Sequence, residues 1–87
     1  MSAKPTYALF IDNAAFSFVI HLPRRDARRI EAELVLLRNN PHKDADYAQR
    51  DSEGHRVVSK IIGAYVMDYW IDEAIKQVNV THIDAAD

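Results

Sequence analysis

The segment from His55 to Ile83 constrains the fold more than any other part of the chain. It contains three short runs rich in β-branched and aromatic residues, separated by breaks of about two residues. Runs of this kind joined by tight turns are typical of antiparallel strands in a meander. The segment therefore predicts three consecutive antiparallel strands at the C-terminal end of the chain.

Side chains alternate between two faces along the middle run, residues 65–72. One face carries Tyr65, Met67, Tyr69 and Ile71, and the other carries Val66, Asp68, Trp70 and Asp72. The first set predicts the core face. In the second set a tryptophan lies between two carboxylates, which indicates a surface for function or for a partner. The alternative is that helices cover this second face instead.

Residues 7–22 precede the most helical part of the sequence. Tyr7 to Asp12 has the composition of a strand, and Asp12-Asn13 supplies a turn or a helix cap. Residues 14–22 fit either a short helix capped by Asn13 or a continuation of the strand. We favour the helix, because a strand of about sixteen residues would far exceed the usual five or six.

Pro23 opens the clearest predicted helix, which runs through Arg38 and stops at Asn39-Asn40-Pro41. An apolar stripe is expected from Ala27, Ile30, Leu34 and Leu37, widened by Val35 and Leu36. Arginines fill the exposed face at its start: Arg24, Arg25, Arg28 and Arg29. They predict either a solvated face or a docking patch for an acidic partner or a phosphate backbone. Glu33 is placed to pair with Arg29.

The remaining segments complete an α+β pattern. Residues 46–50 predict a short edge strand, and residues 51–54 predict a hairpin turn. Residues 1–6 are expected to be a frayed leader, residues 7–83 a single domain and residues 84–87 an acidic tail. The predicted order is β-α-α-β-β-β-β, with two helices packed on a four- to five-stranded, mostly antiparallel sheet. We expect the first strand to pair in the middle of that sheet.

Composition narrows the classes of function. The 87 residues suffice for one modest core, and the absence of cysteine excludes disulfides, thiolate catalysis and cysteine-ligated zinc. The four histidines show no metal-ligand spacing, so we expect no metal and no cofactor. His82 is expected to be packed or hydrogen-bonded within its strand. The sequence has no signal peptide or membrane span, which predicts a cytoplasmic protein.

Three local features together resemble the RelE/ParE superfamily, the toxins of bacterial type II toxin-antitoxin modules, which include plasmid stabilisation proteins. The first is Leu22-Pro23 followed by an arginine-rich helix that ends at Asn40-Pro41. The second is the strand from Gly63 to Asp72, which is similar to the glycine-aromatic central strand of that superfamily. The third is the last strand, residues 78–83. The resemblance covers residues 7–83 and implies the RelE/ParE-like fold.

The resemblance also implies partners and an activity. It implies a toxin or toxin-like protein that binds a cognate antitoxin and a cellular target, with DNA gyrase as the target of ParE-like members. RelE-like members cleave ribosome-bound mRNA with basic side chains, a role that would fall here on Arg50, Arg56, Lys60 and His82. This chain departs from that pattern at Val66, where the superfamily often has arginine.

The departure continues along the same face at Asp68 and in the acidic tail, because carboxylates repel RNA phosphate. We therefore expect a protein that acts mainly by binding other proteins. The alternatives are a ribosome-dependent RNase and a non-toxic module that forms a homodimer through the Trp70 face.

Overall fold

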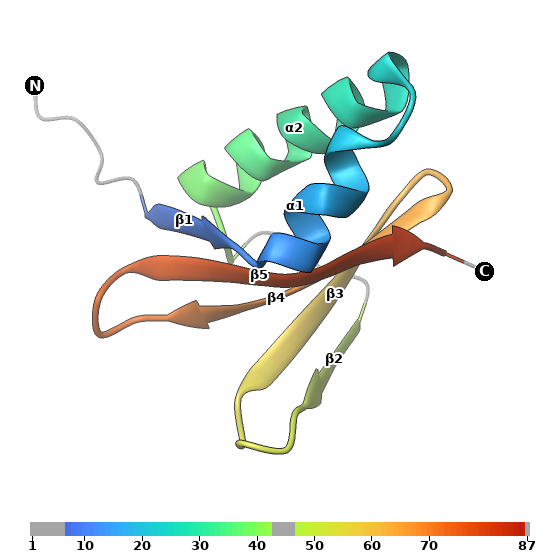
Figure 1. Ribbon diagram of the computed structural model, residues 1–87. Coiled ribbons are helices and arrows are strands. Elements are labelled where there is room, and N and C mark those ends of the chain that lie inside the picture. The colour runs from blue at the N-terminus through green and yellow to red at the C-terminus, as the bar shows by residue number, and fades with distance from the viewer. Residues whose placement is uncertain (1–6, 43–46, 87) are drawn as a thin grey trace, which may run out of the picture.

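Two helices lie on one side of a five-stranded sheet in the computed structural model, which describes residues 7–42 and 47–86 (Figure 1). The elements are β1 (Ala8–Ile11), α1 (Asn13–Ile20), α2 (Arg24–Asn39), β2 (Tyr47–Arg50), β3 (Arg56–Ile62), β4 (Tyr65–Asp72) and β5 (Gln77–Ala85). The predicted order and the α+β class are confirmed. The predicted leader, residues 1–6, lies outside the described residues.

Local sequence sets the ends of both helices. Asp12, rather than the predicted Asn13, caps α1: its Oδ2 atom accepts a 3.2 Å hydrogen bond from the Ala14 amide. Residues 14–22 therefore form mainly a helix, which we favoured over a continuation of the strand. Pro23 caps α2, where it loses no hydrogen bond because the first amides of a helix have no partner within it.

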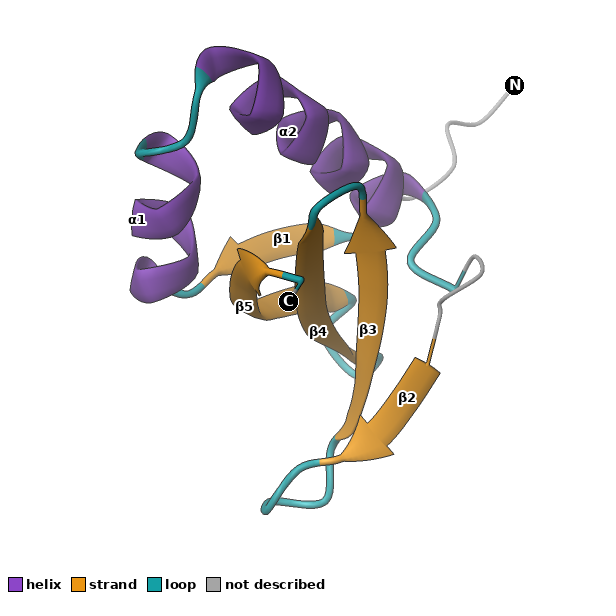
Figure 2. Ribbon diagram, turned by 90° about the vertical axis from the view of Figure 1, so that its right-hand side faces the viewer, coloured by secondary structure: helices purple, strands orange, loops and turns teal. Residues whose placement is uncertain are grey.

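The sheet order is β1-β5-β4-β3-β2, so the prediction that the first strand pairs in the middle is wrong. The reason is the continuity of the meander. β4 lies between β3 and β5, and β2 pairs with the free edge of β3. The interior positions are thus occupied, and β1 pairs in parallel with the outer edge of β5. All the other pairs are antiparallel, and Figure 2 shows the β2–β3 hairpin pointing away from the helices.

The helices cover the face of the sheet that the alternation in β4 predicts to be core. Met67 and Tyr69 are buried, and Tyr65 and Ile71 pack against the same cluster. The main helical contributors are Ile30, Leu34 and Leu37 of α2 with Ala15 and Val19 of α1. The prediction that Val35 and Leu36 widen the stripe is wrong, since they are 49% and 55% exposed. Each residue turns a helix by about 100°, which carries positions 35 and 36 away from the line of residues 30, 34 and 37.

A bulge in β5 changes the direction of its last side chains. Asp68 pairs with His82 but Tyr69 pairs with Val80, so Thr81 is the extra residue. Strict alternation from Val80 would turn His82 inward, whereas the bulge places Ile83 in the core and leaves His82 exposed. Of the two expected states, packed or hydrogen-bonded, His82 has the second: it is exposed, and its Nδ1 atom forms a 3.3 Å hydrogen bond with the Thr81 Oγ1 atom.

Candidate functional site

The face of the sheet opposite the helices is the candidate site, and we call it the open face. The strand registers place the following residues on it: Ala8, Phe10, Gln49, Val57, Ser59, Ile61, Val66, Asp68, Trp70, Asp72, Gln77, Asn79, His82 and Asp84. Its three carboxylates have no lysine or arginine beside them at these positions of the described strands. The face is therefore acidic and aromatic, as the alternation in β4 predicts.

The four predicted catalytic residues do not form one cluster. Arg50 and Arg56 lie directly opposite each other in the β2–β3 pair, where the Arg50 guanidinium donates to the Gly54 carbonyl at 2.7 Å. Lys60 faces the helices and forms a 3.0 Å ion pair with Glu33. His82 lies on the open face, two strands away from Arg56. Arg50, Arg56 and Lys60 therefore lie away from the open face, which carries His82.

The pairing of Glu33 with Lys60 replaces the predicted pairing with Arg29. Arg29 instead extends toward the β3–β4 turn, where its Nη1 atom lies close to Gly63. Asp26, at the start of the same helix, accepts a 2.5 Å hydrogen bond from the Tyr65 hydroxyl. This bond raises the pKa of Tyr65 and ties the start of α2 to the start of β4.

Asp68 lies at the centre of the open face. The Ser59 hydroxyl of β3 donates to its Oδ1 atom at 2.6 Å, and His82 is its register partner on β5. A hollow of about 230 Å³ lies beside it, lined by Gln49, Asp51, Val57, Asp68, Thr81 and His82. Two carboxylates and no lysine or arginine line this hollow, so its chemistry suits a cation better than a phosphate.

Trp70 lies at a fork in the sheet. The β3–β4 ladder ends at Val58 and Tyr69, and beyond that pair the two strands diverge. The His55 ring stacks on the Trp70 indole there, with centroids 3.9 Å apart and planes 9° from parallel. A cavity of about 450 Å³ occupies the fork, lined by His42, His55, Arg56, Val58, Trp70, Ile71, Asp72 and Glu73.

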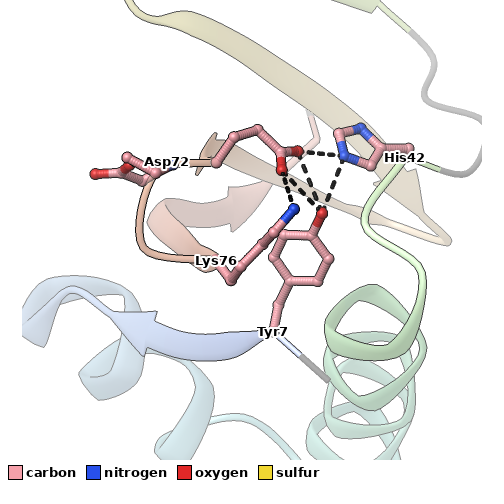
Figure 3. A network of polar contacts seen from close by, with 6 residues as sticks. Tyr7, His42, Asp72 and Lys76 are labelled. Carbon is pink, nitrogen blue, oxygen red and sulfur yellow. Dashed lines mark hydrogen bonds and ion pairs between the residues drawn. The ribbon is translucent and has the colours of Figure 1, made fainter. Parts of the chain in front are cut away.

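A network of polar contacts at the edge of this cavity joins three segments that are far apart in the sequence (Figure 3). Glu73, in the β4–β5 turn, accepts hydrogen bonds from the Tyr7 hydroxyl at 3.0 Å and from the Lys76 ammonium at 3.0 Å. The His42 Nε2 atom lies 2.5 Å from the same carboxylate. Sequence reasoning missed this network, because the residues are far apart along the chain and none of them belongs to a motif.

The network predicts loss of stability in acid. The hydrogen bond from the Lys76 ammonium is the main cause that lowers the pKa of Glu73 below its usual 4.5. Desolvation raises this pKa by less than Lys76 lowers it, and hydrogen bonds with Tyr7 and His42 lower it further. A depressed pKa contributes stability that is present above the unfolded value and is lost as the pH falls through the folded value. The urea midpoint should therefore fall between about pH 5 and pH 3. Glu73→Gln should reduce that fall, and Glu31→Gln, on the exposed face of α2, should not. Equal pH profiles for wild type and Glu73→Gln would contradict this assignment.

The predicted docking arginines are all exposed on α2. Arg24, Arg25, Arg28 and Arg29 take part in no ion pair among residues 7–42 and 47–86. Farther along the helix the outward side chains become apolar at Val35 and Leu36. We call this surface, from Arg24 to Leu36, the helix face. It combines a basic half and an apolar half.

Two further sequence expectations concern metals and membranes. No group of three potential metal ligands occurs within the described parts of the chain. Neither α1 nor α2 is long and apolar enough to cross a membrane.

Comparison with solved structures identifies the fold. No family model and no curated protein matches the sequence. An archaeal RelE-RelB complex from Pyrococcus horikoshii has a TM-score of 0.78 at 17% identity and covers 93% of this chain and 96% of that chain. A RelBE toxin-antitoxin complex from Mycobacterium tuberculosis has a TM-score of 0.78 at 20% identity and covers 100% of both chains.

An E. coli RelE toxin variant in the free state has a TM-score of 0.71 at 18% identity and covers 95% of this chain and 86% of that chain. Similarity over nearly the full length, at identities this low, reports on the fold. It confirms the α+β architecture that the resemblance implied, two helices on a five-stranded, mostly antiparallel sheet. This chain therefore has the RelE-like fold.

Proposed function

We propose that this chain is the toxin or toxin-like component of a bacterial type II toxin-antitoxin pair and that it acts mainly by binding proteins. The helix face is the observation that carries the proposal. Four exposed arginines, which have no carboxylate partner within residues 7–42 and 47–86, continue into exposed Val35 and Leu36. Such a surface suits an antitoxin segment that carries acidic residues at one end and apolar residues at the other. Two of the similar structures are complexes with an antitoxin, which supports a partner of this class.

Protein binding is favoured over RNA cleavage by the charge of the open face. Cleavage at a phosphate requires cations where negative charge develops. Here Asp68 occupies the centre of the face, and Lys60 is engaged with Glu33 on the other side of the sheet. The resemblance implies an arginine at Val66 on this face, where this chain continues with Asp68. That the ribosome or DNA gyrase is the cellular target stays a prediction of the resemblance.

Capture of the antitoxin tests the proposal. The chain is co-expressed with the small protein encoded next to it, and the complex is isolated through a tag on that protein. Arg24→Gln combined with Arg28→Gln should weaken the complex by at least about tenfold, because it removes two adjacent cations from the interface. Arg38→Gln is the matched control, since Arg38 is also exposed but lies at the other end of α2. Equal capture by all the variants, or no capture at all, would overturn the proposal.

The competing RNase function has its own test. Ribosome-bound mRNA is incubated with the purified chain and mapped by primer extension. We expect intact mRNA, because Arg50 and Arg56 lie on the β2–β3 hairpin and His82 lies two strands away from it. Cleavage that disappears in Arg56→Ala or His82→Ala would establish the enzyme and refute a role limited to binding.

A further inference from the structure

A row of side chains crosses the open face from one edge of the sheet toward the other. Phe10 of β1 pairs with Asn79 of β5, which pairs with Trp70 of β4. Phe10 is a large apolar side chain that is 58% exposed, whereas its register partner Asn79 is buried. Aromatic side chains on an uncovered sheet face often mark an interface.

Asn79 makes this row unusual. It is only 8% exposed, and its Oδ1 atom accepts a 2.6 Å hydrogen bond from the Gln77 amide. Its Nδ2 atom is buried and has no acceptor within residues 7–42 and 47–86. A buried amide donor without a partner is unfavourable, and natural proteins seldom keep one without a functional reason. A peptide carbonyl laid between the two aromatic side chains would supply the acceptor.

Carboxylates lie beside this row. Asp68 is the next residue of β4 on this face, two residues from Trp70, and Asp84 is the register partner of Val66 beyond it. The Asp68 Oδ1 atom accepts from Ser59. The hollow next to Asp68 is also lined by Asp51. Successive side chains on one face of an extended segment are two residues apart, and that spacing matches the spacing between these rows.

We propose that the open face binds an extended segment of a partner protein in which basic and apolar side chains share one side. Asp68 and Asp84 receive the basic side chains, Phe10 and Trp70 contact the apolar ones, and Asn79 donates to a backbone carbonyl. Charge complementarity selects this occupant, because none of the strand positions described on this face carries a lysine or arginine that would hold a phosphate backbone. The inference goes beyond the proposed function, since the helix face lies on the other side of the sheet.

Binding of a defined peptide to the full chain tests the proposal. The probe is a short fluorescent peptide in which arginine and valine alternate at every second position with serine between them, so that both share one side of the extended chain, and the readout is fluorescence anisotropy. Asp68→Asn combined with Asp84→Asn should raise the Kd by about tenfold or more, while Glu31→Gln should leave it unchanged. Asparagine still accepts the Ser59 hydrogen bond, so the fold is kept. The same peptide with glutamate in place of each arginine should not bind.

Two further variants separate docking from folding. Phe10→Ala should weaken peptide binding, whereas Phe16→Ala, an equally exposed phenylalanine on α1, should not. Asn79→Val should raise the melting temperature and weaken peptide binding, because it removes both the unpaired donor and the contact. A structural role alone would change the melting temperature without changing the Kd.

Three results would overturn the proposal. The first is a Kd that is the same for wild type and for the Asp68 and Asp84 variant. The second is tight binding of single-stranded RNA that the same variant abolishes. The third is self-association of the chain in sedimentation that Trp70→Ala abolishes, because a second copy would then be the occupant. None of these results changes the capture of the antitoxin by the helix face, so the two proposals fail separately.

Discussion

Replacing Ile30 with alanine is expected to lower the free energy of unfolding by about 3 kcal/mol. Ile30 is fully buried where α2 packs on the sheet, so the change removes apolar contacts and leaves a cavity in the core. Val35→Ala on the same helix is the control. That side chain is 49% exposed, and its loss should cost less than about 0.5 kcal/mol.

Urea unfolding of both variants measures the difference directly. Similar losses for the two positions would mean that α2 is rotated about its axis and that Val35 reaches the core. The helix face would then lose its apolar half, so this experiment also tests the surface on which the proposed function depends.

Replacing Gly63 with valine is expected to cost about 2 kcal/mol, because a β-branched residue strongly disfavours the positive φ of +61° found there. Gly63 is the first of two residues that join β3 to β4, and a glycine at that place is typical of a type II′ hairpin turn. Ala64→Val is the matched control, since Ala64 is exposed and has no positive φ. The urea midpoints of the two variants give the comparison.

The same turn decides which side chains reach the open face. It sets the register in which Ser59 lies opposite Asp68, and a shift by one residue would send Asp68 toward the helices. We therefore expect Gly63→Val to disturb the backbone signals of Ser59 and Asp68 in NMR spectra more than those of α1. A variant as stable as wild type with unchanged signals would show that the turn does not require glycine.

Much of the fold follows from short-range patterns in the sequence. Alternation in β4 identifies Met67 and Tyr69 as core residues, and Pro23 with Asn40 defines α2 to within a residue. These signals are local, because the period of a strand or helix and the chemistry of its ends are carried by neighbouring residues. The position of β1 is not local. It depends on which strand edge stays free after the meander has formed.

The candidate site was predictable to the extent that it lies on one strand. Val66, Asp68 and Trp70 share a face because they alternate along β4. The orientation of His82 was not predictable, because the bulge at Thr81 depends on how β5 pairs with its neighbour. The stacking of His55 on Trp70 and the contacts to Glu73 bring together residues from separate segments, and no spacing in the sequence encodes them.

The edge position of β1 has a consequence for the order in which the chain can fold. Both helices and three strands separate Ala8 from its register partner Gln77 along the chain. The helices and the β2–β4 strands can form from local contacts, whereas β1 must wait until β5 has been synthesised. During synthesis, Phe10 and its neighbours stay without their sheet partner. The sheet is therefore completed late, when β1 pairs with β5.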